Sequence, residues 1–194
     1  RRGHRAGPRR AGAGTRDAIV ADARSHGILW VSAAGNSGQR HWSGTFTDAD
    51  ANLWHEFAPG DELDNIFVTA GSSACVFLKW DSWPATTQDF DSYLFRLADL
   101  SVPVAGSANV QNGSQPPTEQ FCYTNTTGVS QSFGIAIRKF SATAAPRFDL
   151  FVDEGAPQYV VTAGSVTEPA SSPNTMAVGA ICLQNNALQP YSSQ

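Results

Sequence analysis

The sequence has few charged residues, and they are unevenly distributed. Only 15% of the 194 residues are charged, against 41% that are hydrophobic, which is typical of a globular protein with a sizeable core. Residues 1–16 contain six arginines and no acid, so the remainder holds 7 basic and 17 acidic side chains. Because phosphate binding needs a basic face, the acidic body excludes nucleic acid as its partner.

Long hydrophobic runs are also missing. No segment approaches the ~20 apolar residues that a membrane helix requires. No apolar signal-peptide segment follows the basic N-terminus either. We therefore expect no membrane partner, and the chain shows no export signal of its own.

The basic tract at residues 1–14 has no apolar periodicity, and the only methionine of the chain is Met176. Three interpretations stay open. The tract is a disordered tail, an arginine-rich arm for nucleic acid or anionic lipid, or a stretch that a GC-rich gene gives in the wrong reading frame.

Cysteine is scarce, and its spacing fits no metal site. Cys75 and Cys122 lie on predicted strands, so a disulfide is feasible if those strands face each other. Cys182 is expected to be a small buried hydrophobic residue.

The first ordered pattern is that of an α/β unit. Residues 15–27, "TRDAIVADARSHG", predict a short amphipathic helix that Thr15 caps and that ends at Gly27. Residues 28–34, "ILWVSAA", have the continuous apolar character of a strand buried in a parallel sheet. The loop Gly35-Asn36-Ser37-Gly38 follows, at the strand end where such sheets bind ligands.

The composition changes at residues 42–167. Short apolar segments rich in Val, Ile, Phe and Tyr alternate with turn clusters, and no useful helical period is present. This pattern predicts an all-β antiparallel sandwich, jelly-roll-like, inserted into the α/β unit. The predicted strands are "NIFVTAG", "ACVFLKW", "FDSYLFRL", "EQFCYTN", "SFGIAIRKF", "RFDLFVD" and "QYVVTAG".

Residues 168–194 return to the first pattern, because "TMAVGAIC" predicts another buried strand with a glycine inside. The expected organisation is therefore a basic tail at 1–14, a partial α/β domain at 15–41 and 168–194, and a sandwich at 42–167.

Several other groups have both a functional and a structural interpretation. Asp89 and Asp91, with Asp81 nearby, could bind structural Ca²⁺ at a sandwich edge or be solvated turn carboxylates; no other cofactor is expected. Asp61, Glu62 and Asp64 form an acidic turn without ligand spacing. Two sequon-like triplets begin at Asn112 and Asn125. Four tryptophans fit either the sandwich core and rim or a sugar-binding platform: Trp42, Trp54, Trp80 and Trp83.

Residues 18–38, "AIVADARSHGILWVSAAGNSG", and 172–194, "SPNTMAVGAICLQNNALQPYSSQ", together resemble the subtilases, the subtilisin-like serine endopeptidases. In that family a helix leads to a strand that ends in A-A-G-N. The resemblance implies that Asn36 is the side-chain donor of an oxyanion hole and that Gly35 and Ser37 contact substrate. Residues 42–167 are similar to sandwich modules of the bacterial pre-peptidase type, which some bacterial subtilases carry as an insertion.

The resemblance also implies a Ser-His-Asp triad, a protein or peptide substrate, and an extracellular, secreted setting in bacteria. The D-(S/T)-G, H-G-T and G-T-S motifs of the family are absent from this sequence. The sequence therefore indicates part of a serine endopeptidase that is inactive alone. The alternative is a β-sandwich binding module that recognises protein or carbohydrate.

Overall fold

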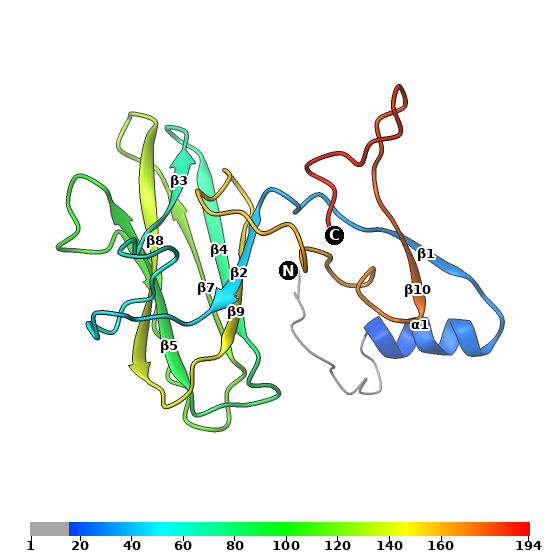
Figure 1. The fold of residues 1–194 in the computed structure, drawn as a ribbon, viewed down its shortest axis with the longest axis horizontal. Helices are drawn as coiled ribbons and strands as arrows, with labels where there is room; N and C mark the ends of the chain where they lie inside the picture. Colours follow the sequence, from blue (N-terminus) through cyan, green and yellow to red (C-terminus); the bar gives the residue numbers. More distant parts are fainter. Residues whose placement is uncertain (1–15) are drawn as a thin grey trace. The chain divides into compact units, whose positions relative to one another are not determined.

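The computed structural model describes residues 16–194, which form two compact units (Figure 1). One unit contains the residues up to Gln39 and Val161–Gln194, and the other contains Arg40–Val160. The proposed tail at residues 1–14 and the predicted helix cap at Thr15 lie outside the described residues.

The first unit is a small α/β arrangement. Helix α1 covers Arg16–Ser25, and strand β1 covers Trp30–Ala33. Strand β10, Thr175–Val178, pairs with β1 in parallel, with Val31 opposite Met176. The predicted helix and adjacent parallel strands are therefore confirmed. Gly27 separates α1 from β1 with a φ of 75°, which favours glycine at this helix end.

The prediction that these two strands are buried is wrong. Val31 and Met176 are each 53% exposed, and Ile28 and Leu29 are more exposed still. Val20 on α1 is buried. The physical reason is that two strands and one helix bury few apolar side chains, whatever the sequence of the strands.

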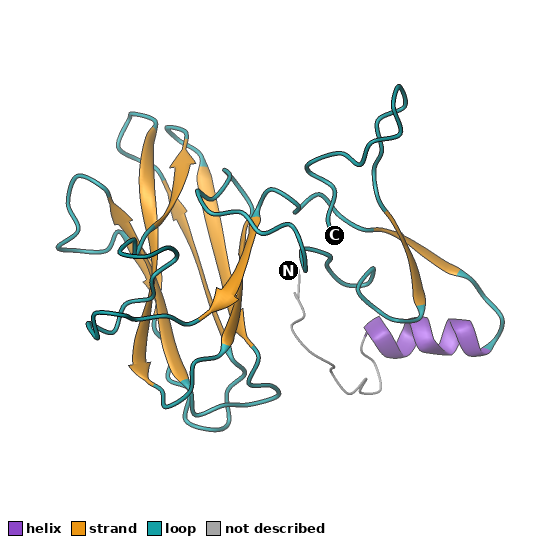
Figure 2. Ribbon diagram, viewed as in Figure 1, coloured by secondary structure: helices purple, strands orange, loops and turns teal. Residues whose placement is uncertain are grey.

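The second unit is an antiparallel β-sandwich of eight strands, shown in orange in Figure 2. One sheet has the strand order β2-β9-β4-β7, and the other has the order β3-β8-β5-β6. The strands are β2 (His41–Thr45), β3 (Asp64–Val68), β4 (Ser73–Trp80), β5 (Asp89–Arg96), β6 (Ala105–Ser107), β7 (Thr118–Thr124), β8 (Gln131–Ser141) and β9 (Arg147–Val152).

The sandwich has an aromatic core. Phe148 on β9 lies 5.1 Å from Phe90 on β5, ring centre to ring centre, and Trp80 lies 5.6 Å from Phe90. All three are fully buried. Edge-to-face pairs of this kind contribute about 0.5–1.5 kcal/mol beyond the area they bury. Trp42 and Trp80 are thus core residues, as the structural interpretation of the tryptophans predicted.

Two strands were not predicted, and one predicted strand is absent. β6 consists of Ala, Gly and Ser, and β2 has Ser43 and Gly44 at its centre, residue types with low β-propensity, so pairing with β5 and β9 fixes these strands in place. The predicted strand "QYVVTAG" is wrong. Its Gln158 N–H donates to the Asn65 carbonyl, and its Tyr159 N–H donates to the Asp64 side chain, so it runs past β3 without forming a ladder.

The cysteines form one disulfide. Cys75 on β4 and Cys122 on β7 are directly opposite each other in one sheet and are bonded. The feasible pairing is therefore present, between neighbouring strands. Cys182 is free and half-buried, so the prediction of a buried residue is wrong. Its thiol lies 2.8 Å from Gln184 Oε1 in the loop after β10.

Residues 16–194 contain no helix with the length and apolar character needed to cross a membrane.

Candidate functional site

The loop after β1 is held from both sides by the C-terminal segment. The Ser37 N–H donates to Ser193 Oγ at 2.9 Å, and the Ser193 N–H donates to the Gly35 carbonyl at 2.9 Å. The Gly38 N–H donates to the Tyr191 carbonyl at 3.0 Å. Ser37 and Ser193 are buried. Hydrogen bonds from its backbone to the C-terminal segment therefore fix the loop.

Both glycines of this loop are required by its geometry. Gly35 has a φ of 106°, a value that residues other than glycine rarely adopt. A Cβ on Gly38 would lie 2.5 Å from the Ser192 carbonyl oxygen, which is too close for any real contact. The glycines thus let the loop take its shape against Ser192 and Ser193.

Asn36 is exposed, although both of its neighbours are tied down. Within residues 16–194 its side-chain amide has no hydrogen-bond partner, so it does not serve as a turn cap. It lies just beyond the carboxyl end of β1, where ligands bind in parallel sheets. The arrangement presents a free amide donor on a fixed backbone.

Gly35 and Ser37 contribute to the site through their backbones. The Gly35 carbonyl and the Ser37 N–H are both engaged with Ser193. Their predicted contact with substrate stays a prediction.

A serine, a histidine and an aspartate come together at the end of α1. Ser25 Oγ lies 3.3 Å from His26 Nδ1, and Asp22 Oδ1 lies 3.7 Å from the same nitrogen. A proton relay needs the serine and the aspartate on opposite ring nitrogens. This exposed group at the end of α1 is therefore a helix-end contact and not a triad.

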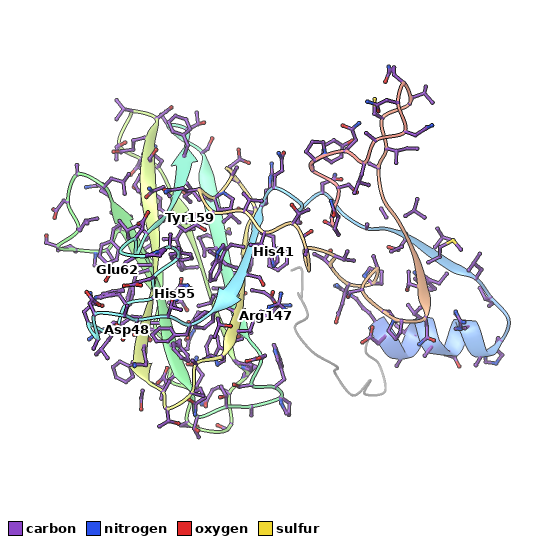
Figure 3. The ribbon with its side chains drawn as sticks, in the orientation of Figure 1. His41, Asp48, His55, Glu62, Arg147 and Tyr159 are labelled. Atoms are coloured by element: carbon purple, nitrogen blue, oxygen red, sulfur yellow. A yellow bond between two sulfur atoms is a disulfide. The ribbon has the colours of Figure 1, made fainter. Side chains whose placement is uncertain are left out.

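The buried histidines belong to the sandwich (Figure 3). His41 Nε2 lies 3.4 Å from Asp149 Oδ1, and Lys79 and Arg147 lie within 4 Å of the same carboxylate. Burial acts to raise the pKa of Asp149, but the hydrogen bond with His41 and the charges of Lys79 and Arg147 outweigh it, so this pKa is lowered. The group is an internal ion-pair network.

His55 is enclosed by aromatic rings. Its ring centre lies 4.9 Å from that of Phe57 and 5.1 Å from that of Trp42. Its Nδ1 accepts the Thr47 N–H at 3.1 Å, so the proton of the neutral ring is on Nε2. Burial lowers the pKa of His55 to about 4. His55 is therefore a neutral core residue at pH 7.

The predicted calcium ligands are not brought together. No group of three His, Cys, Asp or Glu side chains in residues 16–194 is placed to hold a metal ion. Asp81 Oδ1 accepts the Arg147 N–H, and Asp91 accepts the Tyr93 hydroxyl proton. Burial raises the pKa values of Asp89 and Asp91. Asp89 and Asp91 are buried, so the interpretation of these two as solvated turn carboxylates is wrong, whereas Asp81 is exposed.

The acidic turn at residues 61–64 is more structured than its sequence indicates. Asp61 accepts the Tyr159 hydroxyl proton at 2.7 Å, and Glu62 accepts a proton from the Asn52 amide (Figure 3 labels Glu62 and Tyr159). Asp64 is fully buried, and burial raises its pKa to about 7. A single sequence cannot reveal this set, since its members lie on separate loops.

No protein-family model matches the chain, and no curated protein matches it. Among solved structures, it is similar to the Clostridium perfringens CspB protease, with a TM-score of 0.56 and 13% identity over 91% of this chain. The chain spans 40% of that protease. A second likeness, to the pre-peptidase C-terminal domain of the Bacillus anthracis collagenase, has a TM-score of 0.38 and 11% identity, and it covers 59% of this chain and 89% of that domain.

At 13% identity, the similarity to CspB concerns the fold. The chain therefore has an antiparallel β-sandwich joined to a small parallel α/β unit, an architecture that is also found within a protease.

Proposed function

We propose that this chain is part of a subtilisin-like serine endopeptidase and that Asn36 is the side-chain donor of its oxyanion hole. The observation that carries the proposal is the exposed, unpartnered Asn36 amide on a loop whose neighbouring residues are both fixed by hydrogen bonds. The fold similarity to CspB supports it.

The geometry of the loop suits this chemistry. During peptide hydrolysis, negative charge grows on the scissile carbonyl oxygen as the tetrahedral intermediate forms. An N–H held in advance at that position stabilises the transition state more than the ground state. The bonds between Ser193 and the backbone of residues 35–37 supply the fixed position.

The triad is the missing part of the machinery. The sequence contains none of the three family motifs, and Ser192 and Ser193 are buried and engaged in the loop contacts. Without a nucleophile and its base, an oxyanion donor has no intermediate to stabilise. The chain alone is expected not to hydrolyse peptides, and the nucleophile and base would be supplied by other parts of the enzyme.

The proposal includes an extracellular setting. The Cys75–Cys122 disulfide supports it, since such bonds persist in oxidising compartments. The expected partner is a protein or peptide substrate of the complete enzyme.

The test compares two proteins with a fluorophosphonate probe, which labels activated serines. The first is the chain alone, and the second is the chain expressed together with the coding sequence that adjoins it in its gene. We expect labelling only of the second, on a serine outside residues 1–194. Labelling of any serine in the chain alone, or of neither protein, would contradict the proposal.

The role of Asn36 is tested in the labelled protein. Asn36→Ala should lower kcat by about 10²–10³ with little change in KM, the magnitude known for this type of donor in subtilisin. Gln39→Ala is the matched control, because Gln39 is also an exposed amide near this loop. Equal kcat values for the two variants would remove Asn36 from the catalytic machinery.

A further inference from the structure

A pocket of about 330 Å³ lies on the sandwich, beside the second sheet. Its apolar wall consists of Trp54, Leu63, Phe95 and Leu100, and its acidic wall consists of Asp61 and Glu62. Phe95 comes from β5, and the other residues come from the loops before β3 and after β5. The pocket is therefore built from three separate segments of one unit.

The acidic wall carries charge that the protein does not neutralise. Two cations of the same sheet have other partners, since Lys139 pairs with Asp48 and the Arg138 charge acts on Asp91. In the described part of the chain, neither Asp61 nor Glu62 forms an ion pair. Two carboxylates thus line the pocket without an ion-pair partner among the described residues.

The polar side chains of the pocket are chiefly acceptors. Asp61 and Glu62 in their ionised form accept hydrogen bonds and donate none. The amide of Asn52, which reaches Glu62, is already engaged by Glu62 and by Asp50. A sugar needs donors as well as acceptors for its hydroxyl groups, whereas a guanidinium or an ammonium group only donates.

The aromatic wall also suits a cation. Trp54 packs edge-to-face against Phe95 with ring centres 6.0 Å apart. The guanidinium of Arg138 already lies 5.8 Å from the centre of the Trp54 ring. Indole rings attract cations through the negative charge of their faces.

The surroundings indicate that the cation belongs to a polypeptide. A pocket of this size has room for one long side chain. Leu97 and Val102, on the same loop as Leu100, are 42% and 66% exposed and offer apolar contacts for that chain.

We propose that this pocket binds an arginine or lysine side chain of a partner polypeptide. The aromatic wall contacts the aliphatic stem and the edge of the cation, and Asp61 and Glu62 accept its hydrogen bonds. The inference concerns the sandwich alone, so it stands whether or not Asn36 acts in an oxyanion hole.

The test uses the full chain, labelled with ¹⁵N, and three probes at low salt. These are a nine-residue Gly/Ser peptide with a central arginine, the same peptide with citrulline in its place, and free arginine. Citrulline has nearly the shape of arginine but no charge. We expect the arginine peptide to shift the Trp54 indole signal and the amide signals of residues 60–63, and to bind at least tenfold more tightly than the other two probes.

Variants assign the interaction to the acidic wall. Glu62→Gln keeps the acceptor for Asn52 but removes the charge, and it should weaken binding of the arginine peptide at least fivefold. Glu154→Gln changes an exposed acid elsewhere in the sandwich and should leave binding unchanged. Unshifted core signals of Trp42 and Trp80 show that each variant is folded.

Three outcomes would overturn the inference. Equal affinity for the arginine and citrulline peptides would remove the role of charge. If free arginine bound as tightly as the arginine peptide, the partner would not need to be a polypeptide. Methyl glucoside serves as a further control, and a shift of the Trp54 indole signal with this sugar, but not with the arginine peptide, would identify a sugar site instead.

Discussion

Ser37 and Ser193 are joined by a hydrogen bond of 2.9 Å from the backbone N–H of Ser37 to the side chain of Ser193, although they are 156 residues apart. Both are buried. The bond links the loop after β1 to the end of the chain. The serine pair therefore has a structural role. It supports the loop without involving the Asn36 side chain, so support of the loop and the proposed role of Asn36 belong to different residues.

This separation can be measured. Ser193→Ala should remove a buried acceptor and destabilise the loop by about 1–3 kcal/mol, which faster hydrogen exchange of the Ser37 amide would report. Asn36→Ala should change stability by less than about 0.5 kcal/mol, because the side chain is exposed. Equal exchange rates in Ser193→Ala and the unchanged chain would argue against the supporting role of Ser193.

We expect the side chain of Asn125 to stabilise the turn between β7 and β8. Its side-chain amide donates to the Val68 and Val129 carbonyls at 2.9 and 2.8 Å, and it is fully buried. Asn125→Asp removes both donors and buries a charge, so the free energy of unfolding should fall by about 2–4 kcal/mol.

Urea unfolding followed by tryptophan fluorescence measures this loss. Asn112→Asp is the control, because Asn112 is exposed and begins the other sequon-like triplet. If both variants lose the same stability, the buried bonds of Asn125 are not the cause. The same burial makes Asn125 inaccessible to glycosylation in the folded sandwich.

The disulfide should contribute measurably to stability. Cys75 and Cys122 are separated by 47 residues, and a cross-link over such a loop stabilises by about 3–4 kcal/mol in the chain-entropy model. The double variant Cys75→Ser/Cys122→Ser should lose a comparable amount in urea unfolding. Cys182→Ser, which changes the free cysteine, should lose far less, and an equal loss would show that the effect is not due to the cross-link.

Asp64 should give the sandwich a pH-dependent stability. Its folded-state pKa of about 7 lies above the ordinary 3.8, so the folded state binds the proton more tightly. This contribution is complete below about pH 4 and is lost as the pH rises to about 7, in total roughly 4 kcal/mol.

The comparison uses Asp64→Asn, which cannot ionise. The free energy of unfolding of the unchanged chain should fall relative to that of Asp64→Asn between pH 4 and pH 7. The two curves should run parallel above about pH 8. Parallel curves over the whole range would mean that Asp64 titrates alike in both states.

The sequence predicted the parts of the fold that depend on local pattern. The helix near Ile19 and the strands with alternating large apolar residues follow from periodicity. The strands that contain Val31 and Met176 follow from continuous apolar runs, whereas their parallel pairing was expected from the likeness of the two segments to one α/β unit. β2 could not be predicted, because Ser43 and Gly44 have no strand preference and their pairing with β9 decides. The segment around Tyr159 was predicted to be a strand and is not one. Its hydrogen bonds go to Asp61 and Asp64, which are distant in the sequence, so no local pattern could reveal them.

The candidate site was predictable only in part. The setting of Asn36, after an apolar strand and between glycines, is visible in the sequence. The support from Ser193 is not, because nothing local links the two ends of the chain. The pocket beside Trp54 was missed for the same reason, and the acidic turn at 61–64 was its only local signal.

From the cost of loop closure, we expect the pairing of β1 with β10 to follow the formation of the sandwich. These strands are distant in sequence, so their pairing alone would close a long, costly loop. Within the sandwich, however, the Val152 N–H donates to the Arg40 carbonyl, and the Arg40 side chain donates to the Asp153 carbonyl. Once the sandwich has formed, Arg40 and Val152 are already adjacent, so the loop that remains to be closed between β1 and β10 is shorter. We therefore expect the fixed backbone around Asn36 to form late in folding, at a rate that depends on a domain that contributes none of its residues.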